Sequence, residues 1–427
     1  MGACAERLIS RIPAGLSHDD VSATSGSPDN RQLRKCSALT PYVQAGRALA
    51  AAADGILVVP PAKVLRMKQR IKRVQKALSK QNLDALLVRV WEGDNQNVLY
   101  LSGFAGSTGV LVITQKKAYI VTDARYYSRA AEEAPAYKLV KHVRGKKVTE
   151  HINEALKDGE LSKSSRIGFE AGHISVEVAE NWKKELRGEL VPTYHLVERF
   201  RQFKDDKEID QLRHACKATS KVYNEIAEII KPGMTETEVS FELDMRLRKH
   251  GAITNSFTSI VASGPNSAVP HHATGHRKLK AGEPVILDFG GLYPGGYCSD
   301  ITRTVFVPGK KPDAKMVKIY NVVLAANKAA FKALKPGIMW KEFDKIARDH
   351  IAKEGFGQYF THGLGHSLGL VAHDPYDYEN DPFQEGMVVT DEPGIYIEGF
   401  GGVRIEDDVV VTEDGAERLT TAPYWKF

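Results

Sequence analysis

Apolar and polar residues recur with helical and strand-like periods from Met67 onward, and these periods predict an α/β region. The stretch MKQRIKRVQKAL places Ile71, Val74 and Leu78 on one helical face and surrounds them with basic, solvated side chains. Four short apolar segments follow: LDALLVRV, VLYLSG, GVLVIT and AYIVT. We interpret these segments as strands, and ARYYSRAAEEA after them as a helix, in a small domain spanning residues 67–200.

A second domain is predicted over residues 201–427, because longer helical periods begin there and the pattern repeats. One helical stretch ends at Pro232 and Gly233, and Thr235 with Glu238 forms a capping box for the next helix. The same order recurs 104 residues later, since 335 − 231 = 104. The matched positions are Lys231 with Lys335, Pro232 with Pro336, Gly233 with Gly337, Gly251 with Gly355, Gly282 with Gly386, Asp288 with Glu392 and Gly290 with Gly394. This duplication predicts two similar halves around a pseudo-two-fold axis, with the matched acids facing each other at the join.

Residues 1–66 show no sustained period of either kind, and we predict an irregular or disordered extension there. Turn-forming residues such as SATSGSPDN alternate with scattered arginines and an alanine run. The arginines resemble a transit peptide only faintly, and the stretch lacks the charged start and apolar core of a secretory signal. Our hypothesis is that synthesis starts at Met67, which N-terminal mass measurement on protein from its native source would test.

Composition and charge narrow the class of protein. The chain has 427 residues, 42% apolar and 26% charged, which fits two or three folded domains of a soluble protein. The net charge of +6, from 59 basic and 53 acidic residues, is too small to indicate nucleic acid as a partner. Since no apolar run reaches the roughly 18 residues of a membrane span, we expect no membrane association. Four widely separated cysteines argue against disulfides or a structural zinc site and favour the cytoplasm.

Each half of the second domain carries a pair of carboxylates on a predicted hairpin. Asp288 ends the strand VILDFG, and Asp300 lies in YCSDITRTVFV after a turn rich in glycine and proline. In the second half, Glu392 ends the strand in VVTDEPG, and Glu406 lies in VRIEDDVVV after the turn around Gly399 to Gly402. Four carboxylates converging in an apolar interior would resist ionisation unless cations were present. The pattern therefore predicts a site for divalent metal.

A histidine cluster strengthens this prediction. The segment HGLGHSLGLVAHD supplies His362, His366 and His373. Imidazole together with carboxylates suits Mn²⁺, Co²⁺, Fe²⁺ or Zn²⁺, whereas Ca²⁺ and Mg²⁺ prefer oxygen ligands alone. Two such ions would lower the pKa of a shared water and polarise a carbonyl, so we predict metal-assisted hydrolysis.

Two other hydrolase classes are excluded by the order of residues. The run Gly365 to Gly369 matches the nucleophile elbow of serine hydrolases, but that fold needs an acid and then a histidine downstream of the serine. The last histidine of the chain is His373, with no acid between it and Ser367. The zinc-protease pattern His-Glu-x-x-His is also absent.

The motifs PNSAVPHH, VILDFG, YCSDITRT, HGLGHSLGLVAHD, TDEPGIY and GGVRIEDD resemble the pita-bread metallopeptidase family, specifically aminopeptidase P and prolidase, from about residue 67 to the C-terminus. The resemblance implies an α+β fold: a pita-bread (creatinase/aminopeptidase) catalytic domain after a smaller creatinase-type α/β domain. It also implies two divalent ions, with Mn²⁺ favoured over Co²⁺ or Zn²⁺. The implied metal ligands are Asp288, Asp300, His366, Glu392 and Glu406.

The same resemblance implies a role for each residue of the site. Asp300 and Glu406 would bridge both ions, Asp288 would bind one, and His366 with Glu392 would bind the other. The implied catalytic residues are His271, which would bind substrate or stabilise the tetrahedral intermediate; His362, beside the proline ring; His373, at the scissile amide; Glu392, as proton carrier; and Arg404, which would orient the site.

Two segments depart from the family pattern. Asp288 and Asp300 are twelve residues apart (300 − 288 = 12), one more than usual, and we expect the turn around Pro294 to absorb the extra residue. The segment DPYDYENDPFQEGMVVTD lacks the arginine with which prolidases often hold the carboxylate of the substrate. Tyr376, Tyr378, Arg404 or a residue of a neighbouring subunit could replace it.

The resemblance implies a Xaa-Pro dipeptidase acting on small peptides with proline in second position. Aminopeptidase P, which acts on longer peptides, is the alternative. A third interpretation is a non-enzymatic binding module. Such a module would be recognised by the loss of metal ligands, and this sequence has lost none of them. The resemblance also implies a homodimer.

Overall fold

The computed structural model describes residues 61–427 except 94 and 379. Most of the extension predicted over residues 1–66, with its arginines and alanine run, therefore lies outside the described residues. Helix α2 (Pro61–Lys80) includes the predicted amphipathic stretch but already contains Pro61, ahead of Met67. It buries Met67, Ile71, Val74 and Leu78, as the spacing of the apolar residues predicts.

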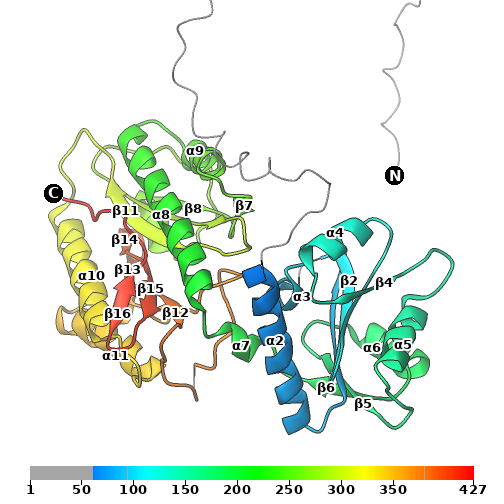
Figure 1. The fold of residues 1–427 in the computed structure, drawn as a ribbon. Helices are drawn as coiled ribbons and strands as arrows, with labels where there is room; N and C mark the ends of the chain where they lie inside the picture. Colours follow the sequence, from blue (N-terminus) through cyan, green and yellow to red (C-terminus); the bar gives the residue numbers. More distant parts are fainter. Residues whose placement is uncertain (1–60, 94, 379) are drawn as a thin grey trace, which may run out of the picture. The chain divides into compact units, whose positions relative to one another are not determined.

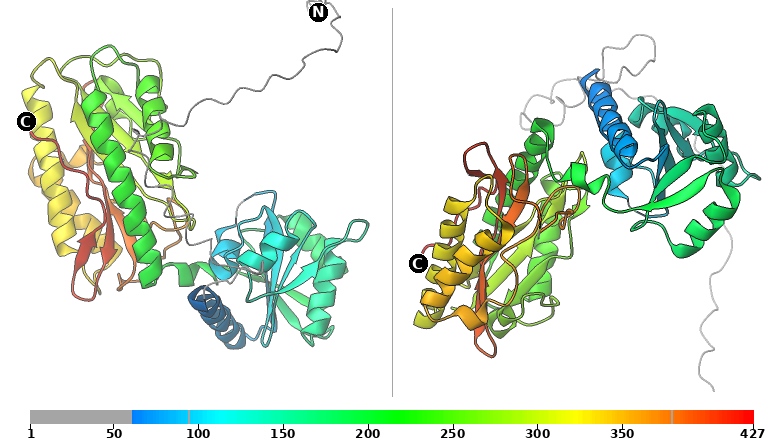
Figure 2. Two further views of the ribbon diagram at one scale, coloured as in Figure 1. Left: turned by 45° about the horizontal axis from the view of Figure 1, so that its top comes forward. Right: turned by 90° about the horizontal axis from the view of Figure 1, so that it is seen from below.

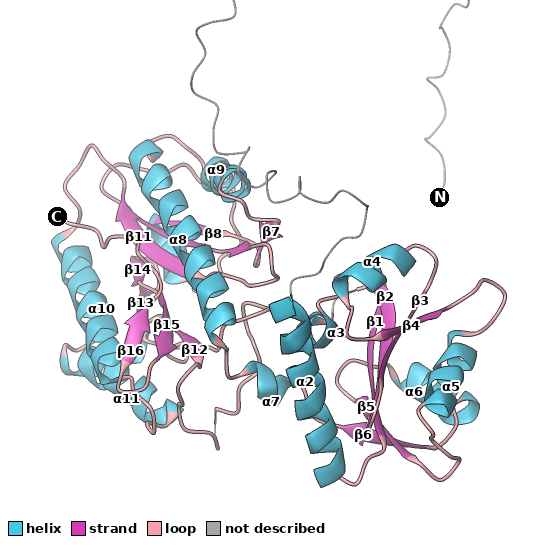
Figure 3. Ribbon diagram, in the orientation of Figure 1, coloured by secondary structure: helices cyan, strands magenta, loops and turns pink. Residues whose placement is uncertain are grey.

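The first domain is built on a six-stranded sheet with the order β4-β3-β2-β1-β5-β6 (Figure 3). Its central strands pair antiparallel, β1 with β2 and β2 with β3, and the outer pairings are parallel. The strands are β1 (Ala85–Trp91), β2 (Thr108–Thr114), β3 (Ala118–Thr122), β4 (Lys138–Lys141), β5 (Arg166–Glu170) and β6 (Glu189–Thr193). The helices are α3 (Gln96–Ser102), α4 (Tyr127–Glu133), α5 (Val148–Asp158) and α6 (Val176–Glu185).

Alternating residues of β1 enter two different cores, so the sheet is buried on both faces. Leu86 and Val88 pack in the cluster that includes α2, whereas Leu87 packs in the cluster that includes Ile152 of α5 and Trp182 of α6. This arrangement confirms the predicted α/β domain.

One predicted strand of this domain is wrong. The segment VLYLSG lies in α3, where the Asn95 side chain accepts a hydrogen bond from the backbone of Asn97 and so caps the helix. Gly103 ends the helix with a φ of +72°, a conformation that glycine adopts without strain. An apolar run this short fits either a strand or a helix, so its periodicity alone could not decide between them.

The second domain contains four long helices in two matched pairs (Figures 1 and 2). The short helix α7 (Glu198–Arg201) precedes them. The first pair is α8 (Asp206–Ile229) with α9 (Glu236–Lys249), and the second is α10 (Ala314–Ala333) with α11 (Trp340–Lys353). Helices α9 and α11 are separated by 104 residues at both ends, since 340 − 236 = 104 and 353 − 249 = 104. The internal repeat is thus present in the helices.

The strands of the second domain lie against these helices. The first half contains β7 (Thr254–Asn255), β8 (Ile260–Ser263), β9 (Pro284–Phe289), β10 (Gly291–Leu292) and β11 (Ile301–Phe306). The second contains β12 (Val388–Asp391), β13 (Gly394–Ile397), β14 (Gly401–Arg404), β15 (Asp407–Val411) and β16 (Ala416–Arg418). Two 3-10 helices span Gly264–Ala268 and Gly357–Tyr359. Helix α8 packs with β9 and β11 in one core, and α10 packs with β12, β14 and β15 in another.

Matched glycines adopt the same backbone conformation in the two halves. The φ angles are +91° at Gly233 and +88° at Gly337, and +83° at both Gly282 and Gly386. These angles lie in the left-handed region, where a Cβ atom would be strained, so the turns need glycine in both halves. The repeat predicted from residue spacing is therefore also a repeat of backbone geometry.

Two buried contacts join the halves near the carboxylates. Thr302 Oγ1 donates to Glu406 Oε2 over 2.6 Å, and Arg303 forms an ion pair with Asp407 over 2.6 Å. Arg303 and Asp407 are almost fully buried, with 1% and 0% of their surface exposed.

The second predicted hairpin is interrupted rather than continuous. Strand β12 ends at Asp391 and pairs with β15, while β13 and β14 form a separate ladder between them. Pro393 stands between β12 and β13 and has no N–H to donate, which accounts for the break. Glu392 and Glu406 consequently lie at the junctions between strands. No helix in the described part of the chain has the length and apolar character needed to cross a membrane.

Candidate active site

One cavity of about 710 Å³ in the second domain brings together the predicted metal ligands and catalytic residues. Its walls come from both halves of the repeat, because β9 and Asp300, just before β11, lie in one half and the segments around β12 and β14 lie in the other. The predicted site residues that line it are His271, Asp288, Asp300, His362, His366, His373, Glu392, Arg404 and Glu406.

The strand register brings the carboxylates together. Asp288 on β9 pairs with Thr302 on β11, and Asp300 stands just before that strand. The backbone N–H of Glu406 donates to the Thr302 carbonyl over 3.0 Å, which places Glu406 beside the first hairpin. Thr302 thereby fixes both the backbone and the side chain of Glu406.

Asp300, His366 and Glu406 form a group suited to a metal ion. One ligand atom from each lies within 4.8 Å of the other two. His366 Nε2 is 3.6 Å from Asp300 Oδ2 and 3.5 Å from Glu392 Oε1. The Oδ1 atom of Asp300 is buried without a hydrogen-bond partner. Because a buried carboxylate oxygen normally has a partner, this orphaned atom and its neighbours fit a divalent cation.

Burial controls the protonation of this group. It raises the pKa of Asp300 and Glu406 well above the usual range, and neighbouring carboxylates raise it further. Burial also raises the pKa of Glu392 to about 8 and lowers that of His366 to about 4. His366 is therefore neutral at pH 7 and keeps a lone pair for a metal, while the carboxylates need a cation to ionise.

This electrostatic crowding predicts a pH dependence of stability. The folded pKa of Glu392 lies above its unfolded value of about 4.5, so its protonated form stabilises the metal-free protein and that stabilisation is lost as pH rises toward about 8. Urea unfolding with chelator at about pH 5 and about pH 8 is expected to show the lower stability at the higher pH, and Mn²⁺ is expected to reverse the trend. Equal stability at both pH values with chelator would contradict a raised pKa of Glu392 in the metal-free protein.

Arg404 is held behind the carboxylates by several bonds. Its guanidinium donates to Asp288 Oδ2 over 2.5 Å, to the Tyr396 hydroxyl over 3.0 Å and to Thr302 Oγ1 over 3.1 Å. The residue is 3% exposed. Since these partners already occupy its donors, Arg404 is suited to orienting Asp288 and poorly suited to holding a substrate carboxylate.

The histidines of the predicted cluster lie at different places in the cavity. His362 Nε2 is 2.8 Å from the hydroxyl of Tyr396, and burial lowers the pKa of His362 to about 4. The ring of His373 stacks on that of His366 with 3.9 Å between centroids. Burial lowers the pKa of His373 as well, so both act as neutral imidazoles at pH 7.

The two tyrosines considered for substrate binding separate in the structure. Tyr378 lines the cavity, and its hydroxyl accepts a hydrogen bond from the Ser367 backbone over 3.1 Å. Tyr376 does not line the cavity, and its hydroxyl donates to the Asp381 carbonyl. Of the two, Tyr378 is the one placed to meet a substrate.

Sequence reasoning missed two side chains that support the site. Tyr396 bonds both His362 and Arg404, and Thr390 donates to Glu392 Oε1 over 3.2 Å while accepting from the His366 backbone over 2.9 Å. Both belong to the quoted motif TDEPGIY, so the alternation of residues around Glu392 was the only signal for them.

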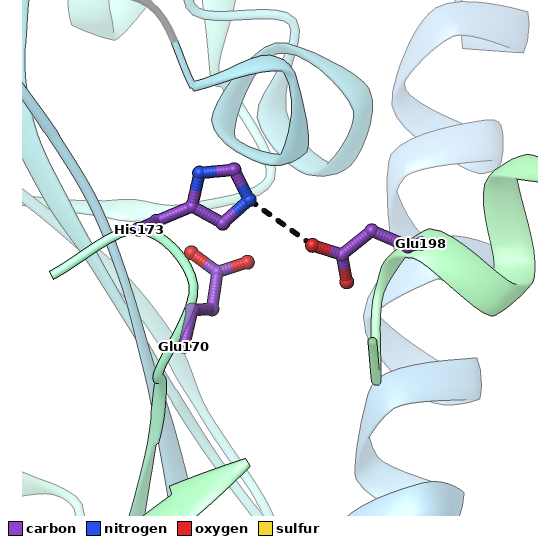
Figure 4. Close-up of side chains that lie close together, drawn as sticks. All are labelled: Glu170, His173 and Glu198. Atoms are coloured by element: carbon purple, nitrogen blue, oxygen red, sulfur yellow. Dashed lines mark hydrogen bonds and ion pairs between the residues drawn. The ribbon is translucent and has the colours of Figure 1, made fainter. Parts of the chain in front are cut away.

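A second group of possible metal ligands lies in the described residues outside this cavity. Glu170, His173 and Glu198 approach one another (Figure 4), and His173 Nε2 is 3.1 Å from Glu198 Oε1. No motif indicated this group, because its members come from separate elements: Glu170 ends β5, His173 follows it in a loop, and Glu198 begins α7.

Comparison with known proteins agrees with the resemblance seen in the sequence. Residues 210–413 match the metallopeptidase family M24, and residues 70–203 match the creatinase/prolidase N-terminal domain. A Xaa-Pro dipeptidase of Pyrococcus horikoshii is 36% identical over 362 residues, which cover 83% of this chain and 97% of that protein.

Solved structures show the same fold. A Xaa-Pro dipeptidase from Bacillus anthracis matches with a TM-score of 0.78 and 36% identity, over 84% of this chain and 99% of that one. An X-Pro aminopeptidase from Thermotoga maritima matches with a TM-score of 0.77 and 32% identity, over 83% and 99%. From these matches, the chain belongs to the metallopeptidase family M24.

Proposed function

We propose that the protein is a two-metal Xaa-Pro dipeptidase that hydrolyses the peptide bond before proline. The observation that carries this proposal is the convergence of His366 with the four carboxylates of both halves in one cavity. The similarity to proteins named Xaa-Pro dipeptidase, over nearly their whole length, supports the choice of substrate.

In this proposal five residues hold two divalent ions, with Mn²⁺ favoured over Co²⁺ or Zn²⁺. Asp300 and Glu406 would hold both ions, Asp288 would hold one of them, and His366 with Glu392 would hold the other. Held by these residues, two such ions would lower the pKa of a bound water and would polarise the carbonyl of the substrate. Neutral imidazole from His366 among carboxylates suits such transition metals.

Glu392 is the proposed proton carrier. It takes a proton from the attacking water and delivers it to the imino nitrogen of proline as the peptide bond breaks. Thr390 donates to the Oε1 atom of Glu392 over 3.2 Å, and the Oε2 atom lies 3.9 Å from Arg404 Nε, so contacts on both oxygens orient the carboxylate.

The histidines bind and orient the substrate. His271 lines the cavity and donates to the oxygen that becomes negatively charged in the transition state. His362, fixed by Tyr396, lies beside the proline ring, and His373 contacts the scissile amide. Arg404 acts from behind Asp288 and keeps that carboxylate in place.

The alternative function is that of an aminopeptidase P, which acts on longer peptides. The similarity to the Thermotoga maritima X-Pro aminopeptidase supports this alternative. We expect the protein with added Mn²⁺ to release proline from an Ala-Pro dipeptide faster than it cleaves an Ala-Pro-Pro tripeptide. Chromatographic measurement of both rates separates the activities. Negligible turnover of the dipeptide beside rapid tripeptide cleavage would favour the aminopeptidase instead.

We propose further that residues 67–200 form the N-terminal domain and residues 201–427 the catalytic domain, and that the protein works as a homodimer in the cytoplasm. The exposed apolar side chains Val176 and Phe241, 75% and 61% exposed, are candidates for contact with a second copy. Sedimentation of the purified protein tests the dimer directly.

A further inference from the structure

The loop that carries His373 has little regular structure of its own. Residues 368–378 form no helix or strand, although they line part of the active-site cavity. The His373 imidazole stacks on His366, and within the described residues it has no hydrogen-bond partner. Its position therefore depends on how the backbone of this loop is held.

The next residue, Asp374, is the anchor of the loop. Its carboxylate is 3% exposed and forms ion pairs with Arg201, through Oδ1, and with Lys204 over 3.4 Å, through Oδ2. Its backbone N–H donates to the Ser367 carbonyl over 2.8 Å. Both cations are themselves buried, so the carboxylate has a fixed place between them.

Gly369 packs closely against the carboxylate of Asp374. A Cβ atom at Gly369 would lie 2.5 Å from Asp374 Oδ2 and 3.2 Å from Lys204 Cε. Glycine at this position lets the two ends of the loop meet around the ion pair.

Arg201 connects the anchor to the N-terminal domain. Its Nη1 atom donates to Asn97 Oδ1 over 2.8 Å, and Asn97, on α3, is completely buried. The Asn97 amide in turn donates to Glu198 Oε1 over 2.8 Å and to Glu170 Oε1 over 2.6 Å. A continuous buried chain thus runs from the two glutamates through Asn97 and Arg201 to Asp374.

The outer end of this chain is the group drawn in Figure 4. His173 bonds to Glu198, and both oxygens of Glu170 accept amide hydrogens, from Asn95 over 2.9 Å and from Asn97 over 2.6 Å. Because these partners already satisfy the carboxylates, the group is better explained as the fixed end of the chain than as an ion site.

We propose that Arg201 and Asn97 are positioning residues for His373. Through Arg201 and Asn97, the N-terminal domain holds the loop of residues 368–378 that carries His373. This inference rests on the proposed function, because it takes His373 to act at the scissile amide. Neither Arg201 nor Asn97 lines the cavity, so neither touches the substrate. They act by fixing Asp374 and, through the backbone, the imidazole of the preceding residue.

The first test compares Arg201→Met with Arg213→Met. Arg213 is a matched control, because it also pairs with a carboxylate, Glu417, but at the surface and away from the cavity. We expect Arg201→Met to lower kcat on an Ala-Pro dipeptide by about 10-fold to 100-fold while KM changes by less than about 3-fold, since a misplaced catalytic group slows the chemical step. Arg201→Lys is expected to restore part of kcat, and Arg213→Met to leave it unchanged.

A double-mutant cycle shows whether the effect passes through His373. In the His373→Ala background, Arg201→Met is expected to cause no further loss of kcat, because the residue that it positions is gone. A loss as large as that seen in the wild-type background would overturn the proposal.

A structural measurement keeps the inference separate from the proposed activity. Hydrogen–deuterium exchange of residues 368–378 is expected to speed up in Arg201→Met and to stay unchanged in Arg213→Met. Asn97→Ala removes the hydrogen bond that ties Arg201 to α3 and keeps the ion pair between Arg201 and Asp374, and it replaces Arg201→Met if that variant does not fold. Unchanged exchange in the variant that folds would overturn the inference, whereas absence of Xaa-Pro cleavage by the wild type would overturn only the proposed function.

Discussion

Replacing Asp300 with asparagine is expected to lower kcat/KM for an Ala-Pro dipeptide by more than about 1,000-fold. In our proposal Asp300 bridges both ions, and an amide cannot supply the negative charge that holds them. Losing several kcal/mol of transition-state stabilisation corresponds to this factor at about 1.4 kcal/mol per tenfold. Proline release and the metal content of the purified variant are the measurements.

The matched control is Asp313→Asn. Asp313 is exposed and caps α10 by accepting from the backbone of Lys315 and Met316, a role that asparagine also fills well. The Asp313→Asn variant is expected to keep wild-type activity. If Asp300→Asn retained more than about a tenth of the activity with saturating Mn²⁺, the bridging role would be wrong.

Although Asp300→Asn should abolish most of the activity, it is expected to stabilise the fold of the protein when metal is absent. Asp300 has a buried oxygen with no partner, and it stands among Glu406, Asp288 and other carboxylates that raise its pKa. At neutral pH the unfolded chain ionises Asp300, whereas the chelated folded protein must keep it protonated at a cost in free energy. Asparagine avoids this cost, so the thermal midpoint of the chelated protein should rise. In the presence of Mn²⁺ the wild type should become the more stable of the two, because it alone binds the ions fully.

Replacing Arg303 with methionine is expected to destabilise the catalytic domain by about 3–5 kcal/mol. The guanidinium bonds Asp407 and the backbone carbonyls of Thr302, Glu406, Ala422 and Pro423. Its loss leaves Asp407, with no exposed surface, short of its main partner. Urea unfolding followed by circular dichroism measures the change.

Arg213→Met serves again as the control, because its ion pair with Glu417 is exposed on both sides. Surface pairs of this kind contribute less than about 1 kcal/mol. A loss in Arg303→Met no greater than in this control would mean that other groups, such as Arg418 at 2.8 Å, already neutralise Asp407.

The spacing of motifs predicted the site more fully than the local pattern predicted the secondary structure. Asp288 and Glu392 at the repeat offset, the further acids Asp300 and Glu406, and the histidine cluster depend only on residue identity and position, and all of them line one cavity. The segment VLYLSG, by contrast, became α3 because a cap at Asn95 and a stop at Gly103 decided between two states that its short apolar run allowed.

The residues that support the active site could not be predicted from the sequence, for a physical reason. Tyr396 and Thr390 matter because of which atoms they meet across strands, and Asn97 matters because Arg201, 104 residues further on (201 − 97 = 104), reaches it through the fold. Such partners are set by tertiary packing, which residue type and period do not encode. Likewise Pro393 breaks the second hairpin, so its two acids meet at strand junctions rather than within one continuous ladder.

The ion pair between Arg303 and Asp407 has a consequence for the origin of the enzyme. The two residues occupy the same position in the two halves, since 407 − 303 = 104, and Thr302 and Glu406 do so as well. A residue that touches its own counterpart lies at the axis relating the halves. In an ancestor assembled from two identical chains, that place would bring together two arginines or two aspartates, and like charges buried in contact are strongly unfavourable. Opposite charges at this axis therefore require two halves that differ in sequence, as they do within this single chain.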